Sequence, residues 1–407
     1  MDVTLRFRAF QLATHYWEAR WIEEMQINLE KSYKDGFTRD KKTRRWRRYA
    51  KITPCFVSTL YKTPDFFSAY EGSVTPIRNL IDLLVIDEAG QVAPEIAGAT
   101  FAMARCAVIV GDEAQIQPVS TSLISVDRAN LTHYGLLDPS WAARESELFV
   151  EKSGMAASRG SVLRIAQRAS AYQYEDYELR GMFLRDHFRC QPQIMDYFNN
   201  LSYDGILRAV NPRFADIQVA PELPFMGYAR ITNSKAEKVG GSRVNRIEAR
   251  TIIEWLLHSQ ALIDWLHNSM AAQKLRKRFA SPELNLSQVI GIVTPFKQQA
   301  NIIKSLLKQT GKTALQNIKV GTVHTFQGGE QPIIIFSPVY DTPSSSYFFD
   351  RDKSMLNVAV SRAQESFLVF GSMAIFRPKE HGKPSEQLAS LLFKYPQNEL
   401  SNIPIIK

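Results

Sequence analysis

The chain alternates short apolar runs with longer segments in which apolar residues recur every three or four positions. Short apolar runs bounded by turn residues are typical of buried strands, and the longer spacing is typical of helices. The pattern predicts strands at residues 53–60, 81–87, 106–110, 289–293, 318–323, 332–337 and 366–370. It predicts helices at residues 5–33, 94–103, 246–275, 297–308 and 354–363, mixed structure at 120–180 and a Ser-rich loop at 341–353. Such alternation of strands and helices predicts an α/β fold with mostly parallel sheets.

One predicted strand, at residues 81–87, brings two adjacent carboxylates, Asp87 and Glu88, to its carboxyl end. Open parallel sheets bind their ligands beyond the carboxyl ends of the strands. Nucleotide hydrolases place one carboxylate there to hold Mg²⁺ and a second one to orient or deprotonate the attacking water. An exposed acidic turn is the alternative, and it is the more common meaning of an isolated Asp-Glu pair.

A second polar cluster follows the predicted strand at 106–110, in the sequence GDEAQ at residues 111–115. A glutamine just past a strand can hydrogen-bond a terminal phosphate or the attacking water, and Gln115 is the candidate for this role. The alternative is an ordinary turn, in which Gly111 adopts a backbone conformation that other residues avoid.

Length and cysteine content narrow the class of protein. A chain of 407 residues favours two domains, and the best boundary lies near residue 180. No apolar stretch has the length of a membrane span, and the N-terminus lacks the layout of a secretory signal. The cysteines Cys55, Cys106 and Cys190 have the spacing of neither a disulfide framework nor a zinc site. A cytoplasmic protein without a membrane partner is the expectation.

The net charge of +9 is concentrated near the N-terminus, because residues 1–80 hold 15 Lys/Arg and 9 Asp/Glu. Six of the eight residues at 41–48 are basic, and Trp46 lies among them. Such a run can contact phosphates, with the ring available for stacking or packing. A solvated helix face or loop is the alternative.

Six sequence motifs, taken in order, resemble those of superfamily-one helicases of the Upf/Dna/Nam group. They lie at residues 85–91 (VIDEAGQ), 111–119 (GDEAQIQPV), 186–192 (DHFRCQP), 291–296 (GIVTPF), 321–330 (GTVHTFQGGE) and 356–363 (LNVAVSRA). Each motif alone is weak, but chance matches do not keep the order of a family. The resemblance covers residues 53–371 of the chain.

The resemblance implies RecA-like P-loop NTPase folds with mostly parallel sheets. Residues 1–52 would be a basic helical remnant of an insertion, 53–180 a partial first domain, and 181–407 a complete second domain. The implied activity is Mg²⁺-assisted hydrolysis of ATP, coupled to movement along single-stranded DNA or RNA.

The resemblance also assigns the nucleotide chemistry. Asp87 would hold Mg²⁺ through the nucleotide, Glu88 would activate water, and Gln115 would sense the γ-phosphate. Arg189 and Arg362 would be arginine fingers, a task that suits a guanidinium because it is always charged and donates in a planar fork. The cofactor-binding residues implied in full are Asp87, Gln115, Arg189, Gly329, Glu330 and Arg362.

Glu330 would contact the ribose or orient a finger, with a solvated loop carboxylate as the alternative. The nucleic-acid groove would be lined by short side chains and backbone N–H groups that follow strands and grip phosphates without reading bases. The implied contacts are Ser58, Thr59, Thr294, Pro295, Phe296, Thr322 and His324. Phe296 and Phe326 are candidates for stacking on bases, and packing into the core is the alternative.

One expected motif does not occur. Helicases of this group begin with a phosphate-binding loop, Gly-x-x-x-x-Gly-Lys-Ser/Thr, before the motif that contains Asp87, and residues 1–86 contain no match. The sequence Gly311-Lys312-Thr313 is a decoy, because Leu306 stands where the first glycine belongs. We therefore expect the later part of a motor core.

Three interpretations stay open at this point: the C-terminal portion of a helicase, one half of a split motor whose phosphate loop comes from an upstream chain, and an inactive remnant that binds nucleic acid. A remnant need not keep the five catalytic candidates together, and this chain does keep Asp87, Glu88, Gln115, Arg189 and Arg362.

Overall fold

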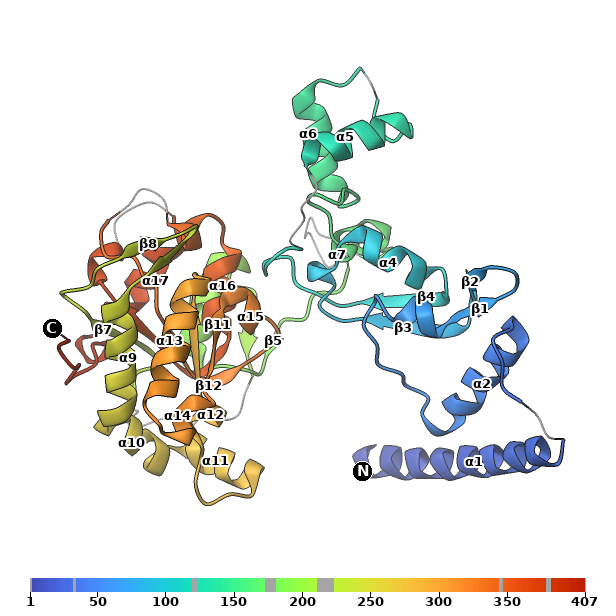
Figure 1. The fold of residues 1–407 in the computed structure, drawn as a ribbon, viewed down its shortest axis with the longest axis horizontal. Helices are drawn as coiled ribbons and strands as arrows, with labels where there is room; N and C mark the ends of the chain where they lie inside the picture. Colours follow the sequence, from blue (N-terminus) through green and yellow to red (C-terminus); the bar gives the residue numbers. More distant parts are fainter. Residues whose placement is uncertain are drawn as a thin grey trace. The chain divides into compact units, whose positions relative to one another are not determined.

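The computed structural model describes residues 2–31, 34–118, 123–138, 140–172, 181–210, 223–343, 347–377 and 382–406. The chain forms two units (Figure 1): unit 1 comprises Met1–Glu113 and Gln117–Gly181, and unit 2 comprises Ala114–Ile116 and Met182–Lys407. The expected α/β class is confirmed. Parts of the expected mixed segment at 120–180 and of the expected loop at 341–353 lie outside the described residues.

Unit 2 is built on a five-stranded parallel sheet in the order β11-β10-β12-β13-β7. Its strands are β7 (Met226–Arg230), β10 (Ile290–Thr294), β11 (Lys319–Thr322), β12 (Gln331–Phe336) and β13 (Ala363–Gly371). The larger helices are α8 (Pro192–Ser202), α9 (Arg246–His258), α10 (Gln260–Asn268), α11 (Met270–Phe279), α13 (Lys297–Gln309), α16 (Ser354–Ser361) and α17 (Pro384–Leu392). The short elements are β5 (Asp186–His187), β6 (Arg208–Ala209), β8 (Glu237–Val239), β9 (Ser242–Val244), α12 (Leu286–Val289), α14 (Thr313–Gln316), α15 (Val323–Phe326), η3 (Phe348–Asp350), η4 (Met373–Ile375) and η5 (Pro396–Asn398).

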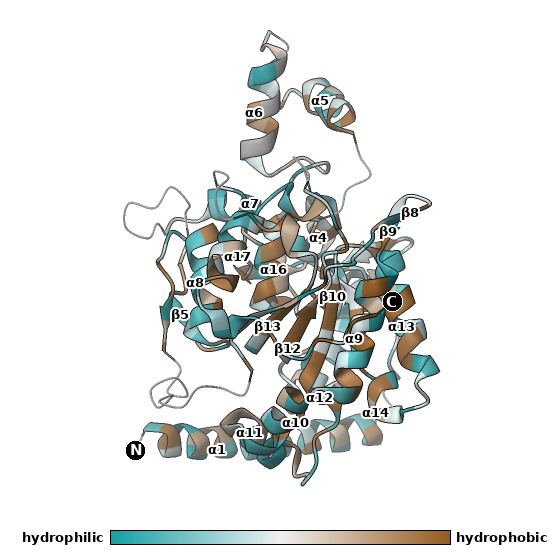
Figure 2. Cartoon of the chain, turned by 90° about the vertical axis from the view of Figure 1, so that its left-hand side faces the viewer, coloured by the Kyte–Doolittle hydropathy of each residue, from teal (hydrophilic) through white to brown (hydrophobic). Residues whose placement is uncertain are grey.

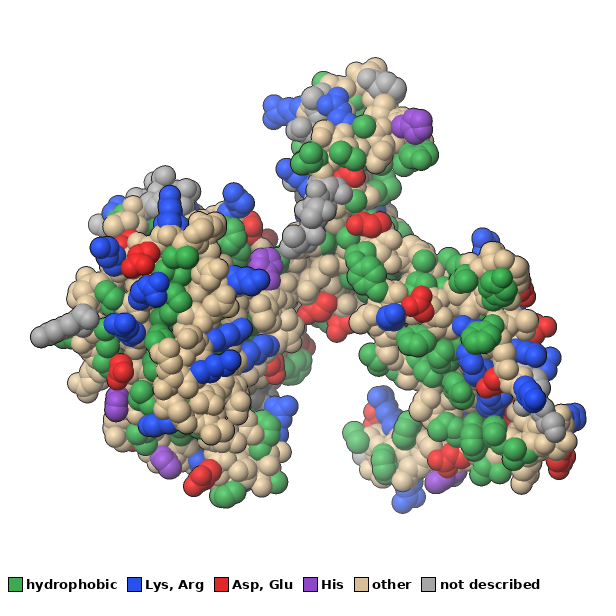
Figure 3. All heavy atoms as spheres, in the orientation of Figure 1, with side chains coloured by type: hydrophobic (Ala, Val, Ile, Leu, Met, Phe, Trp, Pro, Cys, Tyr) green, Lys and Arg blue, Asp and Glu red, His purple; other side chains and the backbone are tan. Residues whose placement is uncertain are grey.

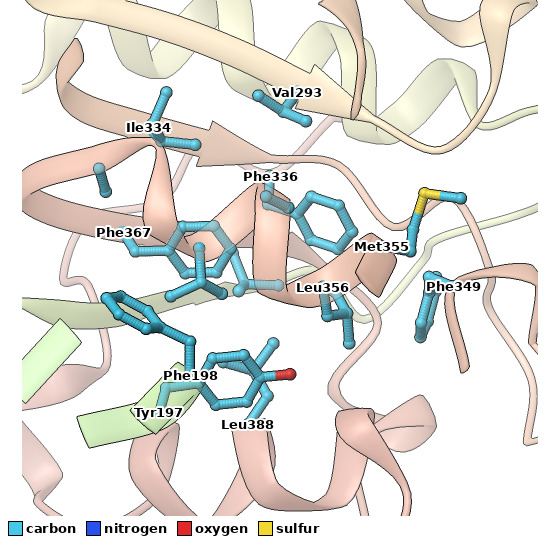
Figure 4. Close-up of a cluster of buried hydrophobic side chains, with 14 of the residues drawn as sticks. Tyr197, Phe198, Val293, Ile334, Phe336, Phe349, Met355, Leu356, Phe367 and Leu388 are labelled. Carbon is cyan, nitrogen blue, oxygen red and sulfur yellow. The ribbon is translucent and has the colours of Figure 1, made fainter. Parts of the chain in front are cut away.

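Helices cover both faces of this sheet, so its strands are apolar on both sides (Figure 2). Ile334 and Phe336 of β12 point into a core formed with α8, α16 and α17 (Figure 4). Ile333 and Ile335 of the same strand point the other way, into a core formed with α9 and α13. Side chains alternate between the faces of a strand, so one apolar run serves both cores.

The single helix expected at 246–275 is wrong, because three helices, α9, α10 and α11, occupy this segment. Serine side chains separate them. The Ser259 hydroxyl accepts the Leu262 N–H at 3.2 Å, and the Ser269 hydroxyl accepts the Ala272 N–H at 3.0 Å. Serine at these positions starts a new helix by satisfying an N–H group that lacks a partner within the helix.

Strand β7 was not predicted, because its sequence contains a glycine and has no long apolar run. A Cβ atom at Gly227 would lie 2.8 Å from the Leu368 side chain of the neighbouring strand β13. The Pro224 side chain would lie closer still, at 2.5 Å, so the side chains packed over this position favour glycine.

Unit 1 contains a parallel pair of strands, β3 (Ile81–Ile86) and β4 (Ala104–Ile109). The remaining elements are α1 (Asp2–Glu30), α2 (Arg39–Ile52), α3 (Thr63–Phe66), β1 (Ser68–Tyr70), β2 (Val74–Pro76), η1 (Ala89–Gln91), α4 (Pro94–Phe101), α5 (Ile124–His133), α6 (Ala143–Ser153) and α7 (Val162–Ala169). Helix α1 buries none of its residues, and apolar side chains lie on its surface (Figure 3). No helix in the described part of the chain is long and apolar enough to cross a membrane.

Within unit 1, the residues that the structure describes cover only one face of the β3–β4 sheet. Ile86 packs with residues of α4 and α7 in a small core. On the opposite face Leu83, Val85 and Val108 are 54%, 58% and 48% exposed. Strand β3 was expected to be buried on both faces, and this expectation is wrong for the second face. We call that face the open face of the β3–β4 sheet.

The strand expected at 53–60 is also wrong, since residues 53–59 form no regular secondary structure. Phe56 packs against Trp46 of α2, with ring centroids 5.2 Å apart, and Trp46 packs against Phe67 at 4.7 Å. Arg48 is buried and binds Asp35 at 3.0 Å. Part of the basic run at 41–48 is therefore occupied in building α2, which leaves fewer cations free to contact phosphates.

Candidate nucleotide and nucleic-acid site

The two candidate carboxylates stand at the carboxyl end of β3. The Glu88 N–H donates to Asp87 Oδ1 at 2.9 Å, and Gln91 Nε2 donates to Glu88 Oε2 at 2.8 Å. Glu88 has a φ of 55°, a left-handed conformation that is uncommon outside glycine. This sharp turn leaves Asp87 exposed and Glu88 half-buried, so the two adjacent side chains have different surroundings.

Two glycines lock the end of β3 to the end of β4. A Cβ atom at Gly90 would lie 2.8 Å from the Asp112 carbonyl oxygen, and one at Gly111 would lie 2.9 Å from the Gly90 nitrogen. The Ala89 N–H donates to the Val110 carbonyl at 2.8 Å. Any side chain at either glycine would separate the two turns, so the glycines fix the position of Asp87 and Glu88 relative to residues 111–113.

These residues fit the metal half of a Mg²⁺-nucleotide site. Asp87 is exposed, and its Oδ2 atom makes no hydrogen bond to any residue that the structure describes. A carboxylate oxygen of this kind is a ligand that Mg²⁺ prefers. Residues 1–86 do not supply the phosphate-binding half of such a site. They hold only two glycines, Gly36 and Gly72, and neither is followed by lysine.

Gln115 belongs to unit 2, in a segment held by two of the sequence motifs. Asn357 Nδ2 donates to the Ala114 carbonyl at 2.8 Å, and Gln327 Nε2 donates to the Ile116 carbonyl at 3.3 Å. Ile116 is buried in the core of unit 2. Asn357 and Gln327 both lie in the sequence motifs, but the motifs alone did not predict this role.

Arg189 forms an ion pair with Glu330, at 2.8 Å, and both side chains are half-exposed. This is the contact expected if Glu330 orients an arginine finger. The turn that carries Arg189 is fixed by its neighbours, since His187 Nε2 accepts the Cys190 N–H at 3.3 Å and lies 3.0 Å from the Cys190 sulfur.

The His187–Cys190 contact is structural. Burial, together with the charge of Arg189, lowers the pKa of His187 to about 4, and burial raises the pKa of Cys190 to about 12. The imidazole is therefore neutral and the thiol keeps its proton at pH 7. Without a thiolate the pair cannot act as a nucleophile and its base.

Arg362 is only 1% exposed and lies inside unit 2. Its guanidinium donates to the carbonyls of Val358 and Gly329 at 3.1 and 3.2 Å, and to the Ser361 hydroxyl at 3.0 Å. The motif predicted a side chain that reaches a phosphate. The structure shows instead that this side chain holds the end of α16 against the turn at Gly329, and the finger role stays a prediction.

The candidate nucleic-acid residues differ in their exposure. Ser58, Thr59 and His324 are exposed, and Thr322 is half-buried with its hydroxyl 3.1 Å from that of Thr325. Thr294 is fully buried and its hydroxyl accepts the Phe296 N–H at 3.4 Å. The expectation that the Thr294 side chain faces a groove is therefore wrong in this structure, because that hydroxyl closes a turn.

The remaining candidates follow β10 or lie near it. Pro295 is buried, and Phe296 is half-buried. Phe326 is fully buried, so it packs into the core and cannot stack on a base. Lys319 lies 4.7 Å from the centre of the Phe326 ring, where the ring face attracts the cation.

A buried polar network in unit 2 was missed altogether. Glu248 is fully buried, and its Oε2 atom accepts the Ser337 hydroxyl at 2.6 Å and the Val339 N–H at 3.0 Å. Gln299 Nε2 donates to Ser337 Oγ at 3.0 Å. The sequence does indicate a buried carboxylate here, because Glu248 lies four residues before Ile252 on the apolar face of α9.

Comparison with known proteins agrees with the motifs. Residues 166–374 match the model of a family described as "AAA domain". "Regulator of nonsense transcripts 1 homolog" of Neurospora crassa is 25% identical over 199 residues, or 46% of this chain and 16% of that protein. "Helicase sen1" of Schizosaccharomyces pombe is 38% identical over 93 residues, or 23% of this chain and 6% of that protein.

A longer match is to "Putative helicase mov-10-B.1" of Danio rerio, which is 25% identical over 325 residues, or 73% of this chain and 28% of that protein. The chain thus spans less than a third of the length of each of these three relatives.

Proposed function

Because the chain belongs to the AAA domain family and is similar to superfamily-one, Upf-like helicases, we propose that it works in a motor that couples Mg²⁺-ATP hydrolysis to movement along single-stranded DNA or RNA. The observation that carries this proposal is the joint at the ends of β3 and β4. There Asp87 and Glu88 stand at the carboxyl end of a parallel strand, where α/β folds bind nucleotides.

In this proposal Asp87 binds the metal, and Glu88, held by Gln91, accepts a proton from the attacking water. Mg²⁺-ATP, when bound, supplies the phosphoanhydride bond that is broken. Arg189, held by Glu330, would donate hydrogen bonds to oxygens of the transferred phosphoryl group. The resemblance assigns the same role to Arg362, although its guanidinium is buried in this structure and bonded to carbonyl groups of unit 2. Gln115 reports the γ-phosphate to unit 2 through the contacts of Asn357 and Gln327.

A second candidate function is half of a split motor, in which another chain supplies the phosphate loop. The open face of the β3–β4 sheet favours it, because parallel sheets are normally covered on both faces. An apolar strand that precedes a Gly-x-x-x-x-Gly-Lys-Ser/Thr loop would bring the missing cradle next to Asp87. An inactive remnant that binds nucleic acid is the third interpretation.

We predict that the purified chain alone turns over ATP at below about 0.1 s⁻¹, against the 1–10³ s⁻¹ that is typical of enzymes, because nothing in residues 1–86 cradles the phosphates. ATP turnover with and without single strands measures this, and Glu88→Gln sets the background. Strand-stimulated turnover above 1 s⁻¹ by the chain alone would show that no added loop is needed. If an added chain with the loop leaves turnover at the level of Glu88→Gln, the remnant interpretation is favoured.

Cys106 offers a direct probe of the open face of the β3–β4 sheet, since it is an exposed residue that pairs with Leu83. A maleimide is expected to label Cys106 and Cys55 but not the buried Cys190. In a Cys55→Ser variant, which reports Cys106 alone, the labelled fraction is expected to fall to the fraction of chain left unbound when a loop-bearing partner is added. Unchanged labelling of a bound complex would place the partner elsewhere.

A further inference from the structure

Two aromatic rings lie together on the rim of unit 2, beyond the carboxyl end of β10. Phe296 lies two residues after the end of β10, and Phe348 begins η3. Their ring centroids are 5.9 Å apart, with 33° between the ring planes. Phe296 is half-buried, and Phe348 is 38% exposed. The two rings therefore present a partly exposed aromatic surface, which we call the rim platform.

Buried aromatic residues hold the rim platform from below. The Tyr340 ring lies 5.6 Å from the Phe296 ring, and the Tyr340 hydroxyl accepts the Phe348 N–H at 3.1 Å. Tyr340 itself packs against the buried rings of Tyr347 and Phe349, at 5.0 and 5.6 Å. Rings supported in this way lose little conformational freedom when a ligand stacks on them.

Cations adjoin the rim platform, and the carboxylate of Asp350 is engaged elsewhere. The Arg243 guanidinium lies 5.0 Å from the centre of the Tyr340 ring, and exposed Lys297 follows Phe296. Asp350, the last residue of η3, accepts the Ser385 N–H at 2.8 Å and the Ser385 hydroxyl at 2.5 Å. An aromatic surface bordered by cations suits a single strand of nucleic acid, whose bases stack and whose phosphates need positive charge.

We propose that Phe296 and Phe348 stack on an unpaired base of a bound single strand and that Arg243 contacts a neighbouring phosphate. This inference rests on the proposed function and deepens it, because Phe348 and Arg243 lie outside the six helicase motifs. Stacking on an aromatic ring tolerates every base, so the rim platform grips a strand without reading its sequence.

The test is to measure the binding of a fluorescent oligothymidine and of an abasic strand of equal length and charge to the full chain. The wild type is expected to bind the oligothymidine more tightly. Phe348→Ala is expected to weaken that binding about 5- to 100-fold and to leave abasic binding unchanged. Phe348→Tyr, which keeps a ring, is expected to retain most of the affinity. Arg243→Gln is expected to weaken binding of both strands and to reduce the salt dependence by about one phosphate contact.

The matched control is Tyr395→Ala, which removes another exposed aromatic ring with a cation beside it, Lys394 at 5.2 Å, away from the rim platform. It is expected to bind both strands like the wild type. Equal affinities of Phe348→Ala and wild type for oligothymidine would overturn the inference, as would an equal loss with the abasic strand. Failure of the wild type to bind either strand would overturn the proposed function itself, and the rim platform with it.

Discussion

Replacing Glu248 with glutamine is expected to stabilise unit 2 above pH 8 and to remove the contribution of Glu248 to the pH dependence of its stability between pH 5 and 8. The carboxyl group is fully buried, and burial raises its pKa from 4.5 to about 8. Hydrogen bonds from Ser337 and Val339 oppose that rise, and the negative charge of Asp341 adds to it. Glutamine has the shape of the protonated acid and cannot ionise.

The direction of this pH effect follows from the number of protons that the folded and unfolded chains bind. Between pH 4.5 and 8 the folded chain keeps the Glu248 proton and the unfolded chain has lost it. The free energy of unfolding therefore falls as pH rises, by about 1.4 kcal/mol per pH unit from this group, or on the order of 4 kcal/mol from pH 5 to 8. The stabilisation is complete below pH 4.5 and is lost as pH passes the folded-state pKa of about 8.

Urea denaturation at several pH values measures this effect, with the fluorescence of the buried Trp255 and Trp265 reporting on unit 2. The matched control is Glu254→Gln, which changes a half-exposed carboxylate on the same helix, α9. It is expected to leave the pH profile unchanged. If Glu248→Gln and the wild type lose stability in parallel from pH 5 to 8, Glu248 does not carry the proton.

The Glu248 network has a further structural consequence, because it holds a strained turn. Val339 has a φ of 74°, and left-handed backbone is unfavourable for a β-branched residue. Glu248 accepts the N–H of this residue, and Asn245 Nδ2 donates to its carbonyl at 3.1 Å. This turn leads from β12 to Tyr340, so the network also supports the rim platform.

Replacing Arg362 with alanine is expected to lower the free energy of unfolding of unit 2 by about 2–5 kcal/mol. The substitution leaves a cavity and deprives two buried carbonyl groups, those of Val358 and Gly329, of their donors. Arg362→Lys keeps the charge, but it lacks the planar fork that reaches three acceptors, so an intermediate loss is expected.

Arg189→Ala is the comparison, because Arg189 is the other proposed finger and forms a half-exposed ion pair. Such pairs contribute about 1 kcal/mol or less to stability, so we expect normal folding of this variant. The same urea denaturation measures both variants. If Arg362→Ala unfolds as the wild type does, the internal hydrogen bonds of Arg362 do not contribute to stability, and its role is confined to the nucleotide.

Four of the five strands in the unit 2 sheet could be predicted because their apolar runs record burial directly, as at 332–337. Other features depend on contacts that a sequence pattern does not contain. The burial of Val85 depends on what covers the second face of its sheet, and the position of Arg362 depends on carbonyl groups of distant segments. Breaks between helices depend on local capping, and Ser259 and Ser269 look like ordinary polar positions in an amphipathic helix.

In the candidate site too, some residues could be predicted from the sequence and others depend on contacts. The pair Asp87 and Glu88 could be found because catalytic carboxylates follow a strand at a fixed spacing. Glu248 and Phe348 belong to no motif, and their meaning comes from partners such as Ser337 and Tyr340. The motifs therefore indicate the chemistry, and the structure adds the groups that hold it in place.

A partner of the kind proposed above, if it covers the open face of the β3–β4 sheet, would link the cellular level of this chain to its own. A molecule that binds only the folded form stabilises it by about 3 kcal/mol when its concentration is a hundred times the Kd. Unbound chains keep Leu83, Val85 and Val108 in water, and chaperones and proteases act on such surfaces. Depletion of the covering molecule would therefore lower the abundance of this chain before any change in motor activity is measured.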